Sequence, residues 1–201
     1  IQRLAELLKI SPLSLLGIGV EYYSRPIGYA ERTRQIEETT DQILQMVGAY
    51  CYLTTSEAFD VAMSAVFDEV TSRAGDDRVA MRSLSEQILG ILVARKRMYM
   101  ARRPGIIAMI SVGVVQHFLE VGVGGGIQVS DRLRRQCREV ASREIAHIAT
   151  LMETEPMGLQ YGLLTGSEPS ASFKIMRSRD WVHLAVNPFH PDGHPSSQTG
   201  V

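Results

Sequence analysis

The stretch PGIIAMISVGVVQHFLEVGVGGG, residues 104–126, decides the fold class of this 201-residue chain. Its apolar run, residues 106–115, has about half of the length that a membrane-spanning helix needs. Polar residues, Glu120 among them, interrupt the sequence after this run. The closing glycines cannot stay helical because each adds a cost in backbone entropy. The stretch therefore predicts a buried helix over residues 106–121 and then a loop, with no transmembrane span.

Four other segments place apolar residues at helical spacing, namely residues 31–53, 54–77, 78–103 and 130–156. The first repeats apolar residues at a period of about 3.6: Ile36, Ile43, Leu44, Met46, Val47 and Tyr50. The third is predicted to turn six apolar residues inward: Val79, Leu84, Ile88, Ile91, Leu92 and Met98. Thr54 and Glu57 have the spacing of a capping box, and Ser130 suits an N-cap. Each segment is therefore predicted to be a helix.

Five or more helices without alternating strand hairpins predict an all-α fold, built of antiparallel helical pairs or an irregular bundle with an irregular C-terminal tail. Three parts are expected: a helical hairpin or linker over residues 1–24, a helical core domain over 29–155, and a tail over 156–201. In the tail, RDWVHLAVNPF, residues 179–189, is long enough for one strand or a docked segment.

Composition narrows the function classes. With 45% hydrophobic and 21% charged residues the chain is globular. A net charge of −1 argues against a surface wholly committed to nucleic acid or acidic lipid. The two cysteines, Cys51 and Cys137, are too few for a disulfide framework, so we interpret them as reduced core residues of a cytoplasmic protein, with a bridge between them as the alternative.

No catalytic, cofactor or metal site is predicted. Glu144 and His147 have the spacing of a di-iron helix, but no second Glu-x-x-His follows, which favours a solvated glutamate beside a half-buried histidine. The tail groups His183, His190, Asp192 and His194 are flanked by Pro and Gly, which hold ligands too loosely for zinc. The run of glycines before residue 127 follows a helix, so it is interpreted as a connector and not a phosphate cradle.

Two basic clusters and one tryptophan are the candidate interaction sites. The clusters are Arg95, Lys96, Arg97, Arg102 and Arg103 in one helix and Arg132, Arg135 and Arg138 in another. If those helices pack side by side, the clusters would merge into a patch for an anionic partner; the simpler interpretation is a solvated face that complements helix dipoles. Trp181 is predicted to anchor the tail in a groove, and binding of a partner is the alternative.

The opening RLAELLKISPLSLLGIG, residues 3–19, begins like a helix-turn-helix. Its second helix offers only Ser14 for reading bases, so a packing hairpin is favoured. The stretch resembles the segment after the DNA-binding domain in large bacterial regulators of the Cro/repressor class, and QILQMVGAYCYLTTSEAFDVAMSAVFDEV, residues 42–70, is similar to the helix pair that comes next there. The resemblance implies a tetratricopeptide-like region that binds an effector, with a DNA reader upstream of Ile1.

Two functions lead from the sequence, and an enzyme such as a small helical metalloenzyme comes third. The leading hypothesis is a non-enzymatic regulatory module of a bacterial transcription regulator that binds a protein, peptide or small-molecule effector. The alternative is a structural assembly protein such as a viral matrix or shell component, because RRQCREVASREIA, residues 134–146, resembles part of the helical bundle of orthomyxovirus matrix proteins. Nucleic acid, through an upstream domain or the basic clusters, and a second copy of the chain are further partners that the sequence allows.

Overall fold

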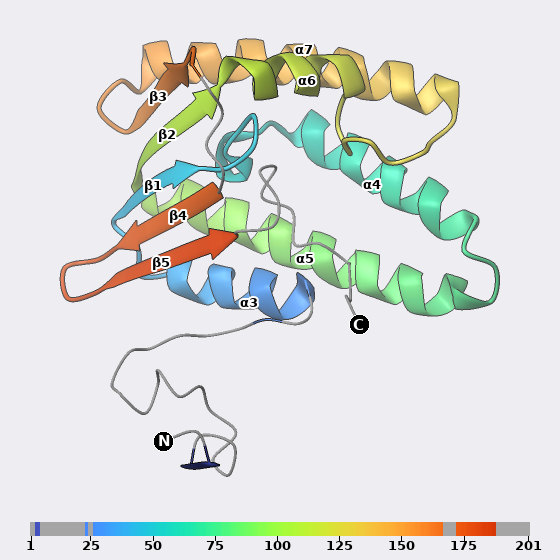
Figure 1. Cartoon of the computed structure of the whole chain (residues 1–201), viewed down its shortest axis with the longest axis horizontal. Helices are drawn as coiled ribbons and strands as arrows, with labels where there is room; N and C mark the ends of the chain where they lie inside the picture. Colours follow the sequence, from blue (N-terminus) through green and yellow to red (C-terminus); the bar gives the residue numbers. More distant parts are fainter. Residues whose placement is uncertain (1–2, 5–22, 24–25, 167–171, 188–201) are drawn as a thin grey trace.

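The fold is α/β and not all-α, so the predicted fold class is wrong. The computed structural model describes residues 3–4, 23, 26–166 and 172–187. Its sheet has five strands in the order β3-β2-β1-β4-β5: β1 Gln42–Met46, β2 Gly105–Ser111, β3 Leu159–Leu164, β4 Ser172–Arg177 and β5 Val182–Asn187. The first three strands are parallel, and β4 runs antiparallel to both β1 and β5 (Figure 1).

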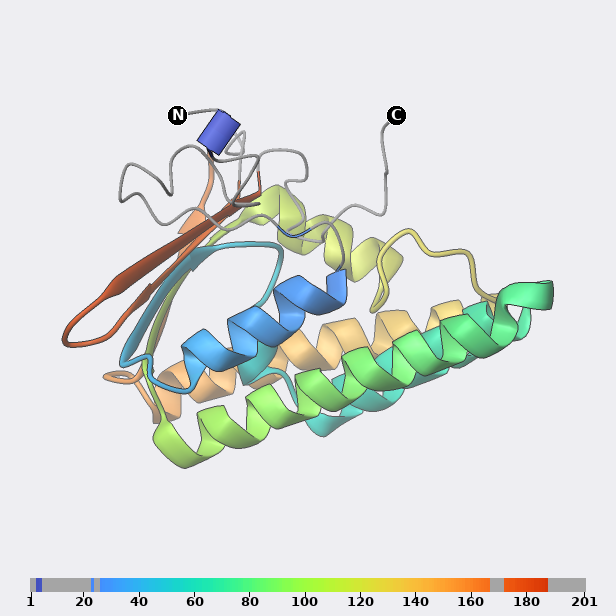
Figure 2. The ribbon, with the colours of Figure 1, turned by 90° about the horizontal axis from the view of Figure 1, so that it is seen from below.

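Five helices are described around this sheet: α3 Pro26–Glu37, α4 Glu57–Ser72, α5 Arg78–Arg102, α6 Val112–Val121 and α7 Asp131–Thr154. Short 3-10 turns, η1 Tyr52–Thr54 and η2 Gly75–Asp77, precede α4 and α5. The α4–α5 hairpin connects β1 to β2, and α6 with α7 connects β2 to β3. The described helices gather on one side of the sheet (Figure 2).

The predicted helix over residues 106–121 begins as a strand. β2 buries Ile106, Ala108 and Ile110, while Ile107 and Met109 between them stay half-buried, which is the two-residue alternation of a sheet. A short apolar run has the same composition in a buried parallel strand as in a buried helix, so periodicity alone could not separate them. The helix α6 starts only at Val112, where the Ser111 hydroxyl accepts a hydrogen bond from the Gly113 N–H at 3.2 Å.

The predicted helix over residues 31–53 is also divided. α3 ends at Glu37, a turn follows, and β1 takes up residues 42–46. Within β1, Ile43 and Gln45 are buried in alternation, and Ile43 pairs with Ile106 of β2 and Met176 of β4. The long-range pairing of β1 on both edges therefore overrides the local helical spacing.

Two hydrophobic cores hold the layers together. One lies among α4, α6 and α7 and contains Phe59, Val66, Phe118, Leu133, Cys137 and Val140. The other joins the sheet to α3 and α5 and contains Ile36, Ile43, Cys51, Tyr99, Ile106 and Met176. Both cysteines are free and buried, as predicted for core residues. The first core also takes in Val123 and Val129, which belong to the connection between α6 and α7.

Some of the other sequence-based predictions are confirmed and others are wrong. The helices α4, α5 and α7, the glycine loop and one strand within residues 179–189 are confirmed. Val79 and Leu84, predicted to face inward, are 81% and 41% exposed. β3 and β4, which the sequence did not predict, pair with β2 and β1. Strands on both sides of residue 155, where the core domain was expected to end, therefore belong to one sheet. The hairpin predicted for residues 1–24 falls almost wholly outside the described residues.

Within the residues that the structure describes, no helix combines the length and the apolar character needed to cross a membrane.

Candidate effector pocket

A glycine loop connects α6 to α7 and folds back onto α7. Gly122 has φ 85° and ψ −172°, a conformation open almost only to glycine. A Cβ at Gly122 would lie 2.7 Å from the backbone N of Arg138 and from the carbonyl carbon of Cys137. The Val123 N–H donates to the Cys137 carbonyl at 3.2 Å, which fixes the loop against the helix. The chain can therefore pass this closely only because residue 122 has no side chain.

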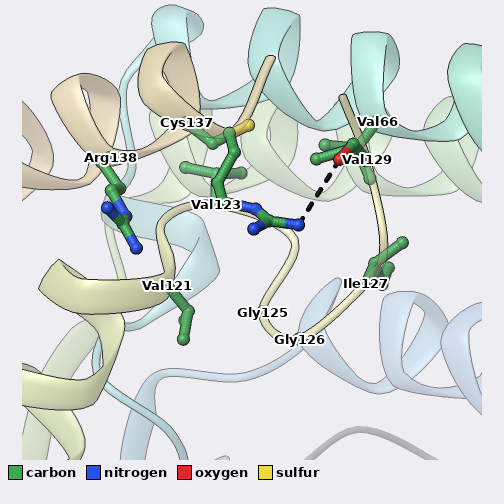
Figure 3. Close-up of a pocket in the computed structure, with 10 residues that line it drawn as sticks. Val66, Val121, Val123, Gly125, Gly126, Ile127, Val129, Cys137 and Arg138 are labelled. Atoms are coloured by element: carbon green, nitrogen blue, oxygen red, sulfur yellow. Dashed lines mark hydrogen bonds between the residues drawn. The ribbon is translucent and has the colours of Figure 1, made fainter. Parts of the chain in front are cut away.

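The loop closes one side of a pocket of about 160 Å³. Its apolar wall comes from α4, from the end of α6, from the loop and from α7: Val66, Val121, Val123, Ile127, Val129 and Cys137. Gly125 and Gly126 also line it, and a Cβ at either would meet no atom within 4 Å. Figure 3 shows these residues on α4, on the end of α6, on the loop and on α7. A group of benzene size fits an apolar cavity of about 150 Å³, so this pocket has the volume for one such group.

Two arginines of α7, Arg134 and Arg138, complete the lining. Arg134 is only weakly engaged, since its guanidinium lies 3.5 Å from the Val129 carbonyl oxygen and 4.0 Å from an Asp131 carboxylate oxygen. Arg138 has no hydrogen bond or ion pair with any described residue and reaches toward the end of α6 that carries Val121 (Figure 3). Spaced four residues apart, the two cations share one side of α7 and repel each other.

One acidic group near the loop, Glu69 of α4, is already paired within the protein. Glu69 of α4 accepts hydrogen bonds from the Ser130 N–H at 2.6 Å and hydroxyl at 2.8 Å, and it forms an ion pair with Arg73. The Ser130 hydroxyl bond is the main cause that lowers the pKa of Glu69. Burial, helped by the charge of Glu69, raises the pKa of the Cys137 thiol. The thiol is thus protonated at neutral pH and lines the pocket as an apolar group.

A separate cluster of charges is buried where α3, α5 and β4 meet. Glu37, at the end of α3, accepts two hydrogen bonds from Arg95 at 2.7 and 2.8 Å and one from Lys174 at 2.6 Å. Burial raises the pKa of Glu37, but the charges of Arg95 and Lys174 outweigh it and lower the pKa to about 2. All three groups are nearly inaccessible, so the cluster holds the sheet to its helices and has no free position for a ligand.

A second buried acid, Glu144 of α7, is not the solvated glutamate that the sequence suggested. It is fully buried and accepts hydrogen bonds from the N–H, at 2.8 Å, and the hydroxyl of Ser56, the N-cap of α4. Lys96 lies at the same helix start and donates to the Ser56 carbonyl at 3.0 Å and to Asp60 at 2.6 Å. These groups lie at the start of α4 and join it to α5 and α7, although the Ser56 side chain itself makes no capping hydrogen bond.

The basic cluster predicted on α5 does not form one exposed patch. Arg95 and Lys96 pair with Glu37 and Asp60, Arg102 reaches the Glu38 carbonyl and Asp41, and Arg103 pairs with Glu155 at 2.9 Å; Arg97 is exposed. α4 packs against both α5 and α7, which separates the two predicted clusters. On α7, Arg132, Arg135 and Arg138 are exposed. An anionic partner for this face remains a prediction.

Trp181 lies just before β5 and packs, half-buried, against the core beneath the sheet. Trp181 belongs to the turn between β4 and β5, and its carbonyl accepts a hydrogen bond from the Ser178 N–H at 3.0 Å. Among the described residues no group of three or more His, Cys, Asp or Glu could hold a metal ion. His190, Asp192 and His194 lie outside those residues.

Sequence reasoning located the glycine loop and Arg138 but not the pocket. Val66 lies in a different helix, and only the tertiary packing of α4 against α7 brings it to the loop. Comparison with protein-family models, curated protein sequences and solved structures finds no match. The resemblance to Cro/repressor-class regulators therefore stays a prediction.

Proposed function

We propose that this chain is a non-enzymatic regulatory module that binds a small-molecule effector in the loop pocket. The observation that carries the proposal is an apolar cavity beside two arginines that the protein itself leaves weakly paired or unpaired among its described residues. Concave apolar sites with a few convergent polar groups are the usual form of small-molecule sites. The pocket is lined by α4, α6 and α7, so an occupant would contact all three helices and stabilise their packing.

The roles of the reactive side chains support the non-enzymatic part of the proposal. The Ser56 hydroxyl donates to Glu144 at the start of α4, and burial keeps the thiols of Cys51 and Cys137 protonated. Every buried side-chain N or O atom of the described residues has a hydrogen-bond partner. These buried polar groups join one element of the fold to another.

The proposal is tested by filling the pocket. Val129→Phe enlarges a half-buried side chain of the pocket lining, and Val182→Phe, at a position that is 66% exposed and outside the lining, is the control. We expect benzyl alcohol and benzoate, titrated into the ¹⁵N-labelled chain, to shift the amide signals of residues 122–130 saturably. Val129→Phe should abolish those shifts, and Val182→Phe should preserve them. If neither compound shifts these signals, the proposed function is wrong.

A further inference from the structure

We infer that the effector is a small monocarboxylate with one apolar group of about ring size, whose apolar group fills the cavity against Val66 and whose carboxylate binds Arg134 and Arg138. The inference rests on the proposed function, because it names the class of ligand for the same pocket. It follows from the volume, the charge and the chemistry of the lining.

The volume sets the apolar part of the ligand. The cavity of about 160 Å³ is lined mainly by valine and isoleucine side chains and a protonated thiol. An apolar cavity of about 150 Å³ accepts a single benzene ring. A larger ring system would extend out of this open pocket into solvent, and an acetate-sized ligand would leave most of the wall without contacts.

The charges set the polar part. Arg134 and Arg138 bring two positive charges to the rim, whereas Glu69 is taken up by Ser130 and Arg73. The carboxylate paired with Arg134 is Asp131, whose side chain is 87% exposed and 4.0 Å away. An anion at the rim would remove the repulsion between the two guanidinium groups, which a neutral or cationic ligand would not do.

The planar guanidinium favours a carboxylate in particular. Arginine binds a carboxylate through two parallel N–H···O bonds, and such charge-assisted pairs are roughly twice as strong as neutral hydrogen bonds. The exposed Arg135 on the same helix adds positive potential without lining the pocket. A free anion is therefore attracted to this end of α7, and the apolar wall then selects for its attached group.

The test compares four probes on the full chain: benzoate, benzyl alcohol, acetate and inorganic phosphate. We expect benzoate to bind about tenfold more tightly than benzyl alcohol, which lacks the charge, and than acetate, which lacks the ring. Arg138→Gln should weaken benzoate binding about five- to tenfold and leave benzyl alcohol unchanged. Arg135→Gln, also at an exposed position but outside the lining, should change benzoate binding by less than about twofold.

Each contrary result has a distinct meaning. Equal binding of benzyl alcohol and benzoate keeps the pocket as a ligand site but overturns the carboxylate assignment. Acetate or phosphate binding as tightly as benzoate would show an adventitious anion site only and overturn it as well. An equal loss in Arg135→Gln and Arg138→Gln would show that general attraction to α7, and not contact in the pocket, accounts for the effect, which also overturns the assignment. Circular dichroism of both variants checks that they fold.

Discussion

Replacing Glu37 with glutamine is expected to lower the free energy of unfolding by about 3 to 5 kcal/mol at pH 7. The substitution keeps the volume of the side chain but removes its charge, so Arg95 and Lys174 remain as two buried cations without a counter-ion. Removing one partner of a buried ion pair costs far more than the intact pair contributes, because the remaining charge stays desolvated. Urea denaturation followed by circular dichroism measures the change.

The same cluster predicts how stability depends on pH. The pKa of Glu37 falls from 4.5 in the unfolded reference to about 2 in the folded chain, although burial acts to raise it, because Arg95 and Lys174 stabilise the carboxylate. A lowered folded-state pKa gives stability that is present above pH 4.5 and lost as the pH falls toward 2. The shift corresponds to about 3 kcal/mol. The difference in unfolding free energy between wild type and Glu37→Gln should therefore shrink over this interval.

Glu31→Gln is the matched control for this experiment. Glu31 also pairs with an arginine, Arg34, at 2.7 Å, but its side chain is 39% exposed. Exposed pairs of this kind contribute about 0.2 to 1 kcal/mol. If both variants lose the same small amount of stability, or if the Glu37→Gln difference persists unchanged at pH 2, the cluster does not link α3 to the sheet through this charge.

The structure of a segment could be predicted from the sequence where residues close together in the chain determine it. α7 was predictable because Ser130 caps it, with its hydroxyl accepting from the Leu133 N–H, and because its apolar stripe is long. β1 and β2 were not, because their apolar residues also fit a helix until the partners on either side are known. β3 and β4 have only six residues each, and parallel pairing of β3 to β2 joins residues that are far apart in the chain, such as Ile106 and Leu159.

The candidate site shows the same division. The loop and its glycines stand out in sequence, and Arg138 was among the predicted anion-binding residues. Arg95 instead pairs with Glu37, and this pair forms only because α3 packs against α5. A basic residue in a sequence carries no sign of whether its counter-ion lies in the protein or in a partner; only the fold separates Arg95 from Arg138.

Gly122→Ala is expected to destabilise the chain by about 3 kcal/mol, and Gly125→Ala by about 1 kcal/mol. Both glycines have positive φ, 85° and 60°, so an alanine at either is strained. Only at Gly122 would the new methyl lie 2.7 Å from the backbone of α7, whereas at Gly125 it meets nothing within 4 Å. The difference between the two variants, measured by urea denaturation, therefore reports the contact between loop and helix, apart from the backbone strain.

The same pair tests whether that contact shapes the pocket. Gly122 and the Val123 N–H hold the loop against Cys137 and Arg138, so moving the loop away should open the cavity wall. We expect Gly122→Ala to lose binding of benzyl alcohol under conditions where it is still folded, while Gly125→Ala keeps it. Equal unfolding free energies in the two variants would mean that the loop can move away from α7 without destabilising the fold. The close approach at Gly122 would then be incidental to the pocket, and its wall would have to depend on the packing of α4 against α7 alone.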